Sequence, residues 1–456
     1  MTTSSPALHV FIGPTLTAAR VRSLGPTAIV HPPVQHGDLL RLATSPGDTV
    51  VIIDGLWHQV PPVRHKEILE LLASGVTVIG AASMGALRAA ELAPYGMVGV
   101  GWVYEQYASS AIDADDEVAV AHTPEGRPLS TALVCIRYAL SAAADVGIIT
   151  RSDVGRLLDR AQALPFQRRT WRALKYVTTG DLAEAYELAR AWLDAQGPAV
   201  TNVKALDAEL AIAQAVAGQL PTAVPPGWQA EPWRTSHLRR WIATYRPAAH
   251  TARASVPFLA VLNHAQLYDP AFPARWRRHV LAWIAAQSPA ARNVEDQALA
   301  AAHARGLDSN ALTPGQIGYW ATPGEIVSLC QRELLLRILV RSARMDPTAS
   351  VWPETPAEAA GLLDADTAAR AAVTAWTTNE RVAATGPGRT LEHLDPKRIH
   401  AHLASQWGIH PSDTAALTAA ARDRGILSLP DAVEAARPFY LAARATSLTV
   451  GTTRQR

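Results

Sequence analysis

The sequence contains few of the residues that mark disulfide-rich, metal-binding or membrane proteins. Its two cysteines, Cys135 and Cys330, lie far apart and outside any metal-ligand spacing, so we expect two reduced thiols in protein cores. No apolar run is long enough to span a bilayer, and the N-terminus lacks a basic segment followed by an apolar one. These absences predict a cytoplasmic protein with no signal peptide and no transmembrane helix.

A strong charge of either sign is also missing. The formal net charge is +2 over 456 residues, which provides no general electrostatic attraction to nucleic acid or to a membrane surface. Neither a Walker A sequence nor a G-x-G-x-x-G sequence is present, so nucleotide binding lacks a motif. We therefore expect no nucleic-acid partner, no membrane partner, no cofactor and no metal.

Phenylalanine and methionine are scarce, whereas tryptophan is common: the chain has 5 Phe and 4 Met but 13 Trp. Two interpretations of the tryptophans in the second half remain open. They fill a core in a chain that is poor in phenylalanine, or they line an aromatic peptide groove. The residues concerned are Trp228, Trp233, Trp241, Trp276, Trp283, Trp320, Trp352, Trp376 and Trp407.

A proline-rich stretch divides the chain. Residues 219–234 hold four prolines and a glycine, a composition typical of a linker. We predict an α/β domain with a helical extension over residues 1–220, a linker over 221–234, and a separate, mostly α-helical domain over 235–456.

Strand and helix patterns alternate in the first hundred residues, which predicts a mostly parallel sheet flanked by helices. The expected strands are 8–13, 27–32, 50–54 and 76–80, and the expected helices are 15–24, 37–44, 65–74 and 83–92. Residues 98–122 look loop-rich and acidic. Further helices are expected at 130–145, 151–163, 168–176, 181–195 and 203–218.

The second half shows helical patterns and no clear strands. The expected helices are 235–246, 255–266, 273–287, 292–304, 322–344, 355–375, 396–407, 411–424 and 430–445.

The most informative segment, residues 54–92, places a serine and a lysine at the same sheet edge. Ser83 follows the predicted strand 76–80, and Lys66 opens the helix before that strand. A crossover helix runs antiparallel to its strands, so its first residues lie at the carboxyl edge of the sheet. Open α/β sheets bind their ligands at this edge. The topology therefore predicts that Ser83 and Lys66 lie near each other.

These residue types suit acyl transfer. A serine hydroxyl becomes a good nucleophile when a base takes its proton, and a neutral lysine amine can be that base. Small residues surround Ser83 in A-A-S-M-G, as a tight nucleophile turn requires. The amides of Met84 and Gly85, at a helix start, could hold a developing oxyanion.

Three further residues are candidates for supporting roles. Asp54 ends a buried strand. It could orient Lys66, bind a partner, or only cap the backbone at the end of the strand. His65 and Glu67 flank Lys66 and diverge around the helix, so at most one of them joins the site. Arg88 could bind a substrate carboxylate at the mouth of the site or form an ordinary surface pair with Glu91.

Several ordered motifs resemble the TfuA-like family, over about residues 8–220. They are FIGPTL (11–16), HPPVQHGDL (31–39), VIIDGLWHQVPPVRHKEIL (51–69), GAASMGALRAAEL (80–92), YGMVGVGWVYEQY (95–107) and DDEVAVAH (115–122). Where the family often has an aromatic pair after Asp-Gly, this chain has Leu56 and Trp57. The resemblance does not extend to residues 235–456.

The resemblance implies a role in peptide thioamide formation beside a YcaO-type enzyme. The implied activity is hydrolysis of a thiocarboxylated, ThiS-like sulfur-carrier protein, which releases sulfide for the YcaO partner. The family's Ser–Lys pair, carried onto this chain, falls on Ser83 and Lys66. A precursor peptide is a further possible partner.

Two other functions remain open. The chain could be a non-catalytic adaptor that docks the sulfur carrier and the precursor peptide onto a YcaO partner, with Ser83 capping a helix and Lys66 solvated. It could also be a different α/β hydrolase, such as an amidase, that uses the same pair.

Overall fold

The structure is a computed structural model, and it divides the chain into two compact units, residues 1–233 and 234–456. It describes residues 6–57, 60–123, 125–219, 233–286, 293–308, 311–345, 351–353, 355–386 and 388–445. Most of the predicted linker, 221–234, lies outside these residues. No helix in the described ranges combines the length and the apolar character that crossing a membrane requires.

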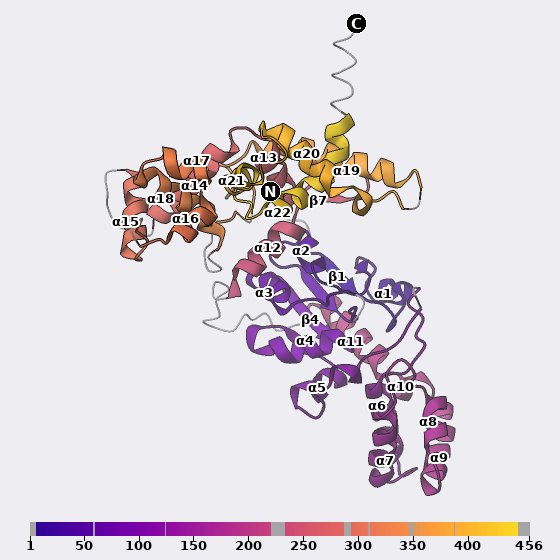
Figure 1. The fold of residues 1–456 in the computed structure, drawn as a ribbon. Helices are drawn as coiled ribbons and strands as arrows, with labels where there is room; N and C mark the ends of the chain where they lie inside the picture. The colour runs from indigo at the N-terminus through magenta and orange to yellow at the C-terminus, as the bar shows by residue number, and fades with distance from the viewer. Residues whose placement is uncertain are drawn as a thin grey trace. The chain divides into compact units, whose positions relative to one another are not determined.

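The first unit is built on a five-stranded sheet in which every neighbouring pair is parallel (Figure 1). The strand order is β2-β1-β3-β4-β5. This arrangement confirms the predicted parallel α/β fold. The strands are β1 (Leu8–Phe11), β2 (Ile29–His31), β3 (Thr49–Ile52), β4 (Thr77–Ala81) and β5 (Val98–Val100).

Helices follow most of these strands, and a longer helical run follows the sheet. The helices of this unit are α1 (Ala18–Leu24), α2 (Asp38–Arg41), α3 (His65–Ala73), α4 (Met84–Leu92), α5 (Trp102–Ala108), α6 (Leu133–Asp145), α7 (Arg151–Gln162), α8 (Trp171–Val177), α9 (Asp181–Gln196), α10 (Pro198–Thr201) and α11 (Val203–Ala217).

The sheet is covered on both faces because its central strands are apolar at nearly every position. Val50 and Ile52 of β3 pack on one face with residues of α2, α3 and α4. Val51 and the following Ile53 pack on the other face with α1 and α11. Successive residues of a strand point to opposite faces, so an unbroken apolar run is buried on both sides. Helix α11 therefore completes the α/β layer instead of extending away from it.

The prediction that residues 98–122 form a loop-rich segment is wrong at its start. Residues Val98–Val100 form β5, which pairs with β4 at the edge of the sheet, and Trp102–Ala108 form α5. The strand Val-Gly-Val is short and contains glycine, so its local propensity is weak. Pairing with β4 supplies the stability that the local sequence lacks.

Helices α6 to α9 form a cluster with its own apolar core (Figure 1). Leu133, Ile136 and Leu140 of α6 meet Leu157 of α7 and Tyr186 of α9 in this core. The predicted helical extension is confirmed for these elements.

Two glycines let α4 begin directly against the sheet. A Cβ atom on Gly85 would lie 1.8 Å from the carbonyl oxygen of Ile52, and one on Gly80 would lie 2.0 Å from the carbonyl oxygen of Gly85. The Gly85 amide donates a hydrogen bond to the Ile53 carbonyl at 3.2 Å. The start of α4 is thus held against β3 and β4 at a separation that no other residue type allows.

Gly85→Ala should destabilise the first unit by about 3 kcal/mol, because the methyl group must displace backbone atoms. Gly155→Ala is the matched control: a Cβ atom added to Gly155, inside α7, would have nothing within 4 Å of it. This control should be neutral or stabilise by up to about 1 kcal/mol. Urea unfolding of the full chain measures both values, and a harmless Gly85→Ala would refute the close contact.

The second unit is mostly helical, as predicted. Its helices are α12 (Ser236–Tyr245), α13 (Phe258–Tyr268), α14 (Phe272–Ala285), α15 (Val294–Ala304), α16 (Pro314–Trp320), α17 (Pro323–Ser328), α18 (Gln331–Ser342), α19 (Ala365–Ala383), α20 (Pro396–Trp407), α21 (Thr414–Arg422) and α22 (Leu429–Ala436).

Three expectations for this unit are wrong in detail. The helix predicted over 355–375 begins only at Ala365, as α19. A short antiparallel pair, β6 (Pro247–His250) and β7 (Ser255–Pro257), occurs where no strand was expected. These strands lack the alternation that identifies a strand, and they are stabilised by packing on α13 and α19. The single helix predicted over 322–344 is two helices, α17 and α18, because the chain is extended at Leu329 and Cys330.

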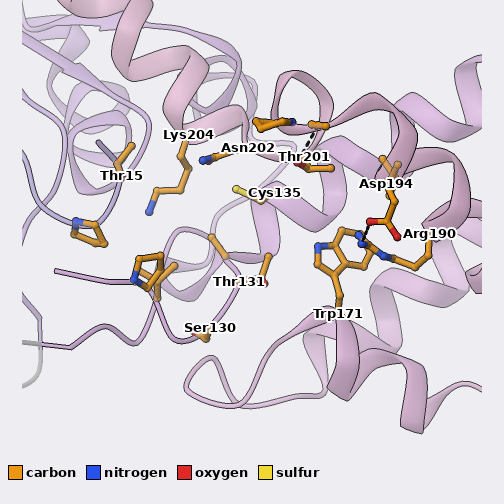
Figure 2. A pocket seen from close by; sticks show the side chains of 17 residues that line it. Thr15, Ser130, Thr131, Cys135, Trp171, Arg190, Asp194, Thr201, Asn202 and Lys204 are labelled. Atoms are coloured by element: carbon orange, nitrogen blue, oxygen red, sulfur yellow. Dashed lines mark hydrogen bonds and ion pairs between the residues drawn. The ribbon is translucent and has the colours of Figure 1, made fainter. Parts of the chain in front are cut away.

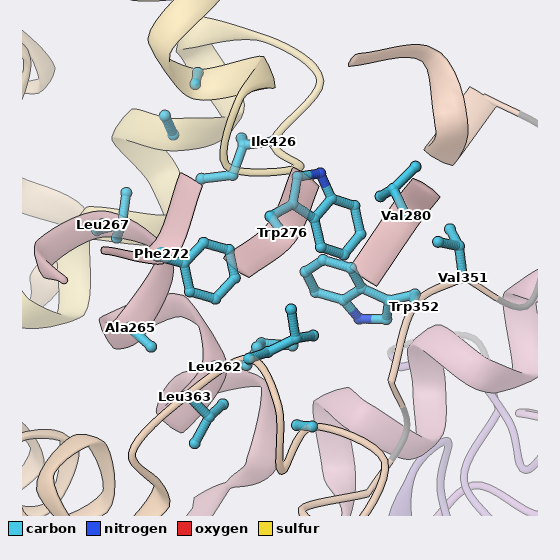
Figure 3. Packing of buried hydrophobic residues seen from close by; sticks show 14 of the residues in the cluster. Leu262, Ala265, Leu267, Phe272, Trp276, Val280, Val351, Trp352, Leu363 and Ile426 are labelled. Carbon is cyan, nitrogen blue, oxygen red and sulfur yellow. The ribbon is translucent and has the colours of Figure 1, made fainter. Parts of the chain in front are cut away.

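Two tryptophans, Trp276 and Trp352, lie in the core of this unit (Figure 3). Trp276 is fully buried, and its ring meets Trp352 edge-to-face with 5.7 Å between centroids. Gly425, at φ +72°, lies so close that a Cβ atom would be 2.8 Å from the Trp276 ring. For these two tryptophans the core-filling interpretation is confirmed.

A buried ion network holds α17, α18 and α21 together. Arg341 is 2% exposed, and its guanidinium donates to both carboxylate oxygens of Glu325 and to both of Asp423, at 2.7–2.9 Å. It also donates to the Trp320 carbonyl at 2.7 Å. Burial alone would raise the pKa of Glu325, but hydrogen bonds from Arg341 and the Thr322 amide lower it to about 2.

The second unit should lose stability as pH falls from about 4.5, the unperturbed pKa of Glu325, toward about 2. The folded state holds this carboxylate ionised in that range while the unfolded state takes up a proton, so protons favour unfolding. Glu325→Gln should flatten this dependence and should be less stable at pH 7, whereas Glu392→Gln, at an exposed site in the same unit, should behave like wild type. Urea titrations between about pH 7 and pH 2.5 test this, and an unchanged slope in Glu325→Gln would contradict it.

Candidate functional site

A cavity of about 500 Å³ lies at the carboxyl ends of the strands in the first unit. Ser83, just beyond β4, and Asp54, just beyond β3, both line it. The segment 118–123 and residues 166–167 form much of the remaining wall. Ser83 and Asp54 were both expected at this edge of the sheet, and the structure brings both to one cavity.

The backbone around Ser83 is strained. Ala82 has φ +66°, and the Ser83 amide donates to the Ala81 carbonyl at 2.6 Å, which closes a γ-turn around Ala82. A positive φ in such a turn is costly for a residue with a side chain, and strain of this kind gathers at functional sites. The turn directs the chain from β4 into α4 and leaves Ser83 7% exposed.

The Ser83 hydroxyl does not cap α4. Ser83 occupies the N-cap position, yet its side chain accepts no capping hydrogen bond. Its carbonyl oxygen, by contrast, accepts from the Ala86 amide at 3.0 Å. A structural role as helix cap therefore does not explain this serine.

The two amides proposed for an oxyanion differ in availability. The Gly85 amide already donates to the Ile53 carbonyl, so in this conformation it holds α4 against the sheet and is not available to an oxyanion. The Met84 amide is the first of α4, and it has no hydrogen-bond acceptor among the described residues. A helix N-terminus also carries a partial positive charge, which favours an anion at this place.

Asp54 organises the loop after β1. One carboxylate oxygen accepts from the Gly13 amide at 2.9 Å and the Thr15 amide at 3.0 Å, and the other accepts from the Thr15 hydroxyl at 2.7 Å. Asp54 is 2% exposed. Of the roles considered for it, the observed one is to cap this loop at the cavity.

A lysine that the sequence analysis did not single out lies beside Asp54. Lys204 of α11 is 4% exposed, and its amine is 4.0 Å from Asp54 Oδ1. The same amine donates to the Val118 carbonyl at 3.0 Å. Both contacts are with residues that line the Ser83 cavity. A buried lysine is rare unless it is paired or functional.

Lys204 left only a weak signal in the sequence. It lies on the apolar face of α11, one turn before Asp207. Two charged residues on an apolar helix face indicate that both are buried and bound to partners. Asp207 accepts the amides of Trp102 and Val103 at 3.0 and 2.8 Å and so holds the start of α5. Burial raises the pKa of Asp207 to about 6 in spite of these hydrogen bonds.

A second cavity, of about 400 Å³, adjoins the first, because both are lined by Pro14 and Val120. Lys204 lines this second cavity near Thr15, and Trp171, Arg190 and Asp194 lie at its other end (Figure 2). Cys135 lies between these ends, and burial raises the pKa of its thiol.

Lys66, the predicted partner of Ser83, is the second residue of α3 and is half-buried. It is not among the described residues that line the Ser83 cavity. Its neighbour Glu67 is fully buried and binds His36 at 2.6 Å and the Gly37 amide at 2.8 Å. The Ser83–Lys66 pair therefore stays a prediction.

His65 and Arg88 meet on the surface instead of at the cavity. Both bind the carboxylate of Glu91, at 2.8 Å from His65 and 2.6 Å from Arg88. Burial alone would raise the pKa of Glu91, but these hydrogen bonds hold it below its usual value. Of the two roles considered for Arg88, the pair with Glu91 is the one observed.

His122 also lines the Ser83 cavity, and its Nδ1 is 2.8 Å from the Thr123 carbonyl. The acidic residues before it form ion pairs: Asp116 with Arg169, and Glu117 with Arg137. No group of three or more potential ligands among the described residues is placed to hold a metal ion.

The fold and the cavity define an α/β protein with a buried serine at a strand-to-helix turn, and the side chain of this serine does not cap the helix. Residues 54–170 match the family described as TfuA-like protein, which confirms the resemblance for about a quarter of the chain. A comparison with curated proteins yields no match. TfuA-like proteins are associated with YcaO partners in general.

Ala82→Gly should leave the free energy of unfolding within about 0.5 kcal/mol of wild type, because glycine relieves the positive φ at the turn. Ala86→Gly, at a buried position inside α4, should cost about 1 kcal/mol or more. Urea unfolding compares the two. An equal loss in both variants would show that the turn around Ala82 is not strained.

Proposed function

We propose that this protein hydrolyses the thiocarboxylate of a sulfur-carrier protein with Ser83 as nucleophile and a lysine as base. In this proposal the released sulfide serves a YcaO-type enzyme that forms peptide thioamides. The observation that carries the proposal is the Ser83 hydroxyl, which makes no capping hydrogen bond to α4. A strained turn holds Ser83 in a cavity at the carboxyl edge of the sheet. The match to TfuA-like proteins supports the same function.

Two lysines are candidates for the base. Lys66 is the lysine that the sequence predicts, and neither Lys66 nor Lys204 is among the described residues that line the Ser83 cavity. Lys204 is favoured by position, since its amine contacts Asp54 and Val118, two residues of the cavity wall. A base must come within hydrogen-bond reach of the proton it takes, although such contacts often tighten only when substrate binds. We therefore assign the role to Lys204 and retain Lys66 as its competitor.

The proposed reaction has two acyl-transfer steps. The lysine accepts the Ser83 proton while Ser83 Oγ attacks the thiocarboxylate carbon, and the Met84 amide faces the developing oxyanion. The C–S bond breaks, sulfide leaves with a proton, and an acyl-serine ester remains. Water then attacks this ester with the lysine as base. The products are hydrogen sulfide and a carrier that ends in a carboxylate.

Ser83→Ala should lower sulfide release from a thiocarboxylated carrier by about 10³-fold or more, because the nucleophile is gone. Lys204→Met should lower it by about 10²-fold through loss of the base, with a smaller effect from Lys66→Met. Sulfide release and the mass of the carrier C-terminus measure the reaction. Ser74→Ala and Lys175→Met, changes in the same unit but outside the cavity, are the matched controls.

The variants also separate the competing functions. An adaptor would keep supporting thioamide formation after Ser83→Ala, and that result would refute the hydrolase. A larger loss in Lys66→Met than in Lys204→Met would reassign the base to Lys66. Equal rates on simple esters or amides would favour a general hydrolase. Circular dichroism of each variant shows whether the fold is kept.

A further inference from the structure

A small cavity in the second unit contains a buried arginine that no carboxylate compensates. The cavity has a volume of about 280 Å³ and lies between the α16–α17 turn and one face of α21. Its lining includes Tyr319, Trp320, Thr322, Thr414, Thr418 and Arg422. Arg422 is 8% exposed.

The guanidinium of Arg422 contacts carbonyl groups, aromatic rings and the Tyr319 side chain, but no carboxylate of the described residues. Its Nε donates to the Leu427 carbonyl at 3.1 Å, and its Nη1 donates to the Tyr319 carbonyl. The rings of Tyr319 and Trp320 lie 4.4 and 4.7 Å from its central carbon. Its Nη2 has no acceptor in the part of the chain that the structure describes. The N–H groups of Nη2 are therefore available on a side chain that lines the cavity.

The nearest acidic groups do not neutralise this charge. Asp423 and Glu325 are both bound by Arg341, which donates two hydrogen bonds to each carboxylate. No carboxylate of the described residues lies within 4.0 Å of Arg422. Burial lowers the pKa of Arg422, whereas that of Arg341 is raised by its two carboxylates in spite of burial. The two arginines thus differ chiefly in the presence of an anion.

Two half-buried arginines show what a purely structural role looks like. Arg424 donates to the Ala420 carbonyl and lies over the Trp407 ring, and Arg344 donates to the Gly425 carbonyl and lies over Trp352. Neither lines this cavity. Their charges are held by nearby carbonyls and by rings, although the buried Nε of Arg424 has no hydrogen-bond partner among the described residues. Arg422 makes the same kinds of contact, but its side chain also lines the cavity.

Hydroxyl groups complete the polar lining. Thr322 Oγ1 accepts from the Glu325 amide at 3.2 Å, so its own O–H remains a donor. The Thr418 hydroxyl donates to the Thr414 carbonyl at 2.8 Å and is therefore committed. The cavity thus offers N–H and O–H donors beside a positive charge, which is the donor set that an anion requires.

We propose that this cavity binds a carboxylate of a peptide, with Arg422 Nη2 as the main donor and the Tyr319 and Trp320 rings against the apolar part of the ligand. A single guanidinium edge matches a monoanion better than a phosphate dianion. The volume admits one side chain or one chain terminus. The site lies outside the unit that carries Ser83, so it is independent of the proposed hydrolase.

The carboxylate can come from an acidic side chain or from a chain terminus, and small probes separate the two. Binding of N-acetyl-aspartamide, with a side-chain carboxylate, and of N-acetyl-alanine, with a terminal carboxylate, is measured on the full chain by saturation-transfer NMR. N-acetyl-asparaginamide is the neutral control, and inorganic phosphate is the competing anion. We expect millimolar binding of at least one carboxylate probe, with no binding of the neutral probe.

Arg422→Gln should weaken this binding at least about 10-fold, whereas Arg424→Gln should leave it within about 2-fold of wild type. Thr418→Phe, at a half-buried position, fills the cavity without removing a charge and should abolish binding as well. This second variant decides the question if Arg422→Gln fails to fold. Ser83→Ala should bind like wild type.

Any of four results would overturn the proposal. They are no carboxylate binding up to about 20 mM, equal binding of the neutral probe, undiminished binding in both Arg422→Gln and Thr418→Phe, and tighter binding of phosphate than of either carboxylate.

Discussion

The candidate site depends on how closely α4 approaches the sheet. Gly80 and Gly85 lack the side chains that would separate helix from strand, and the Gly85 amide ties the helix start to the Ile53 carbonyl. The γ-turn around Ala82 is the cost of this tight connection. Because the turn is held from both sides, Ser83 has a defined position beside the end of β3. The cavity, the Asp54 loop contacts and the neighbouring Met84 amide are all arranged around that position.

Most buried charges in both units are paired with an opposite charge. Arg422, like the half-buried Arg344 and Arg424, has no anionic partner among the described residues, but of these three it alone lines the cavity beside α21. Asp54 has three hydrogen bonds and a lysine at 4.0 Å, and Arg341 has two carboxylates. Burial makes an unpaired charge costly, so these groups are satisfied by partners from distant parts of the chain. Arg422 has carbonyls and rings but no anion among the described residues. A buried arginine that has no anionic partner and lines a cavity is a reason to look for an anionic ligand.

The segment that matches TfuA-like proteins does not contain the whole site. Residues 54–170 supply Asp54, Ser83 and the wall formed by 118–123. The loop with Thr15 precedes this segment, and Lys204 follows it. Helix α11 returns to the sheet and inserts Lys204 beside Asp54, so the site is assembled from three stretches of sequence. The second unit lies wholly outside the match, and its chemistry has to be argued from its own side chains.

Local pattern was sufficient to predict the parallel α/β fold, four of the strands and the place of Ser83 after β4, because apolar periodicity and glycine positions act over a few residues. It was insufficient for β5, the β6–β7 pair and the break between α17 and α18, which depend on pairing and packing with distant elements. The lysine beside Asp54 is the clearest case: Lys204 reaches a carbonyl 86 residues away in sequence. Arg422 likewise meets Tyr319 across 103 residues. Such contacts arise only when the chain folds back on itself, since no short-range pattern records which buried side chains will become neighbours.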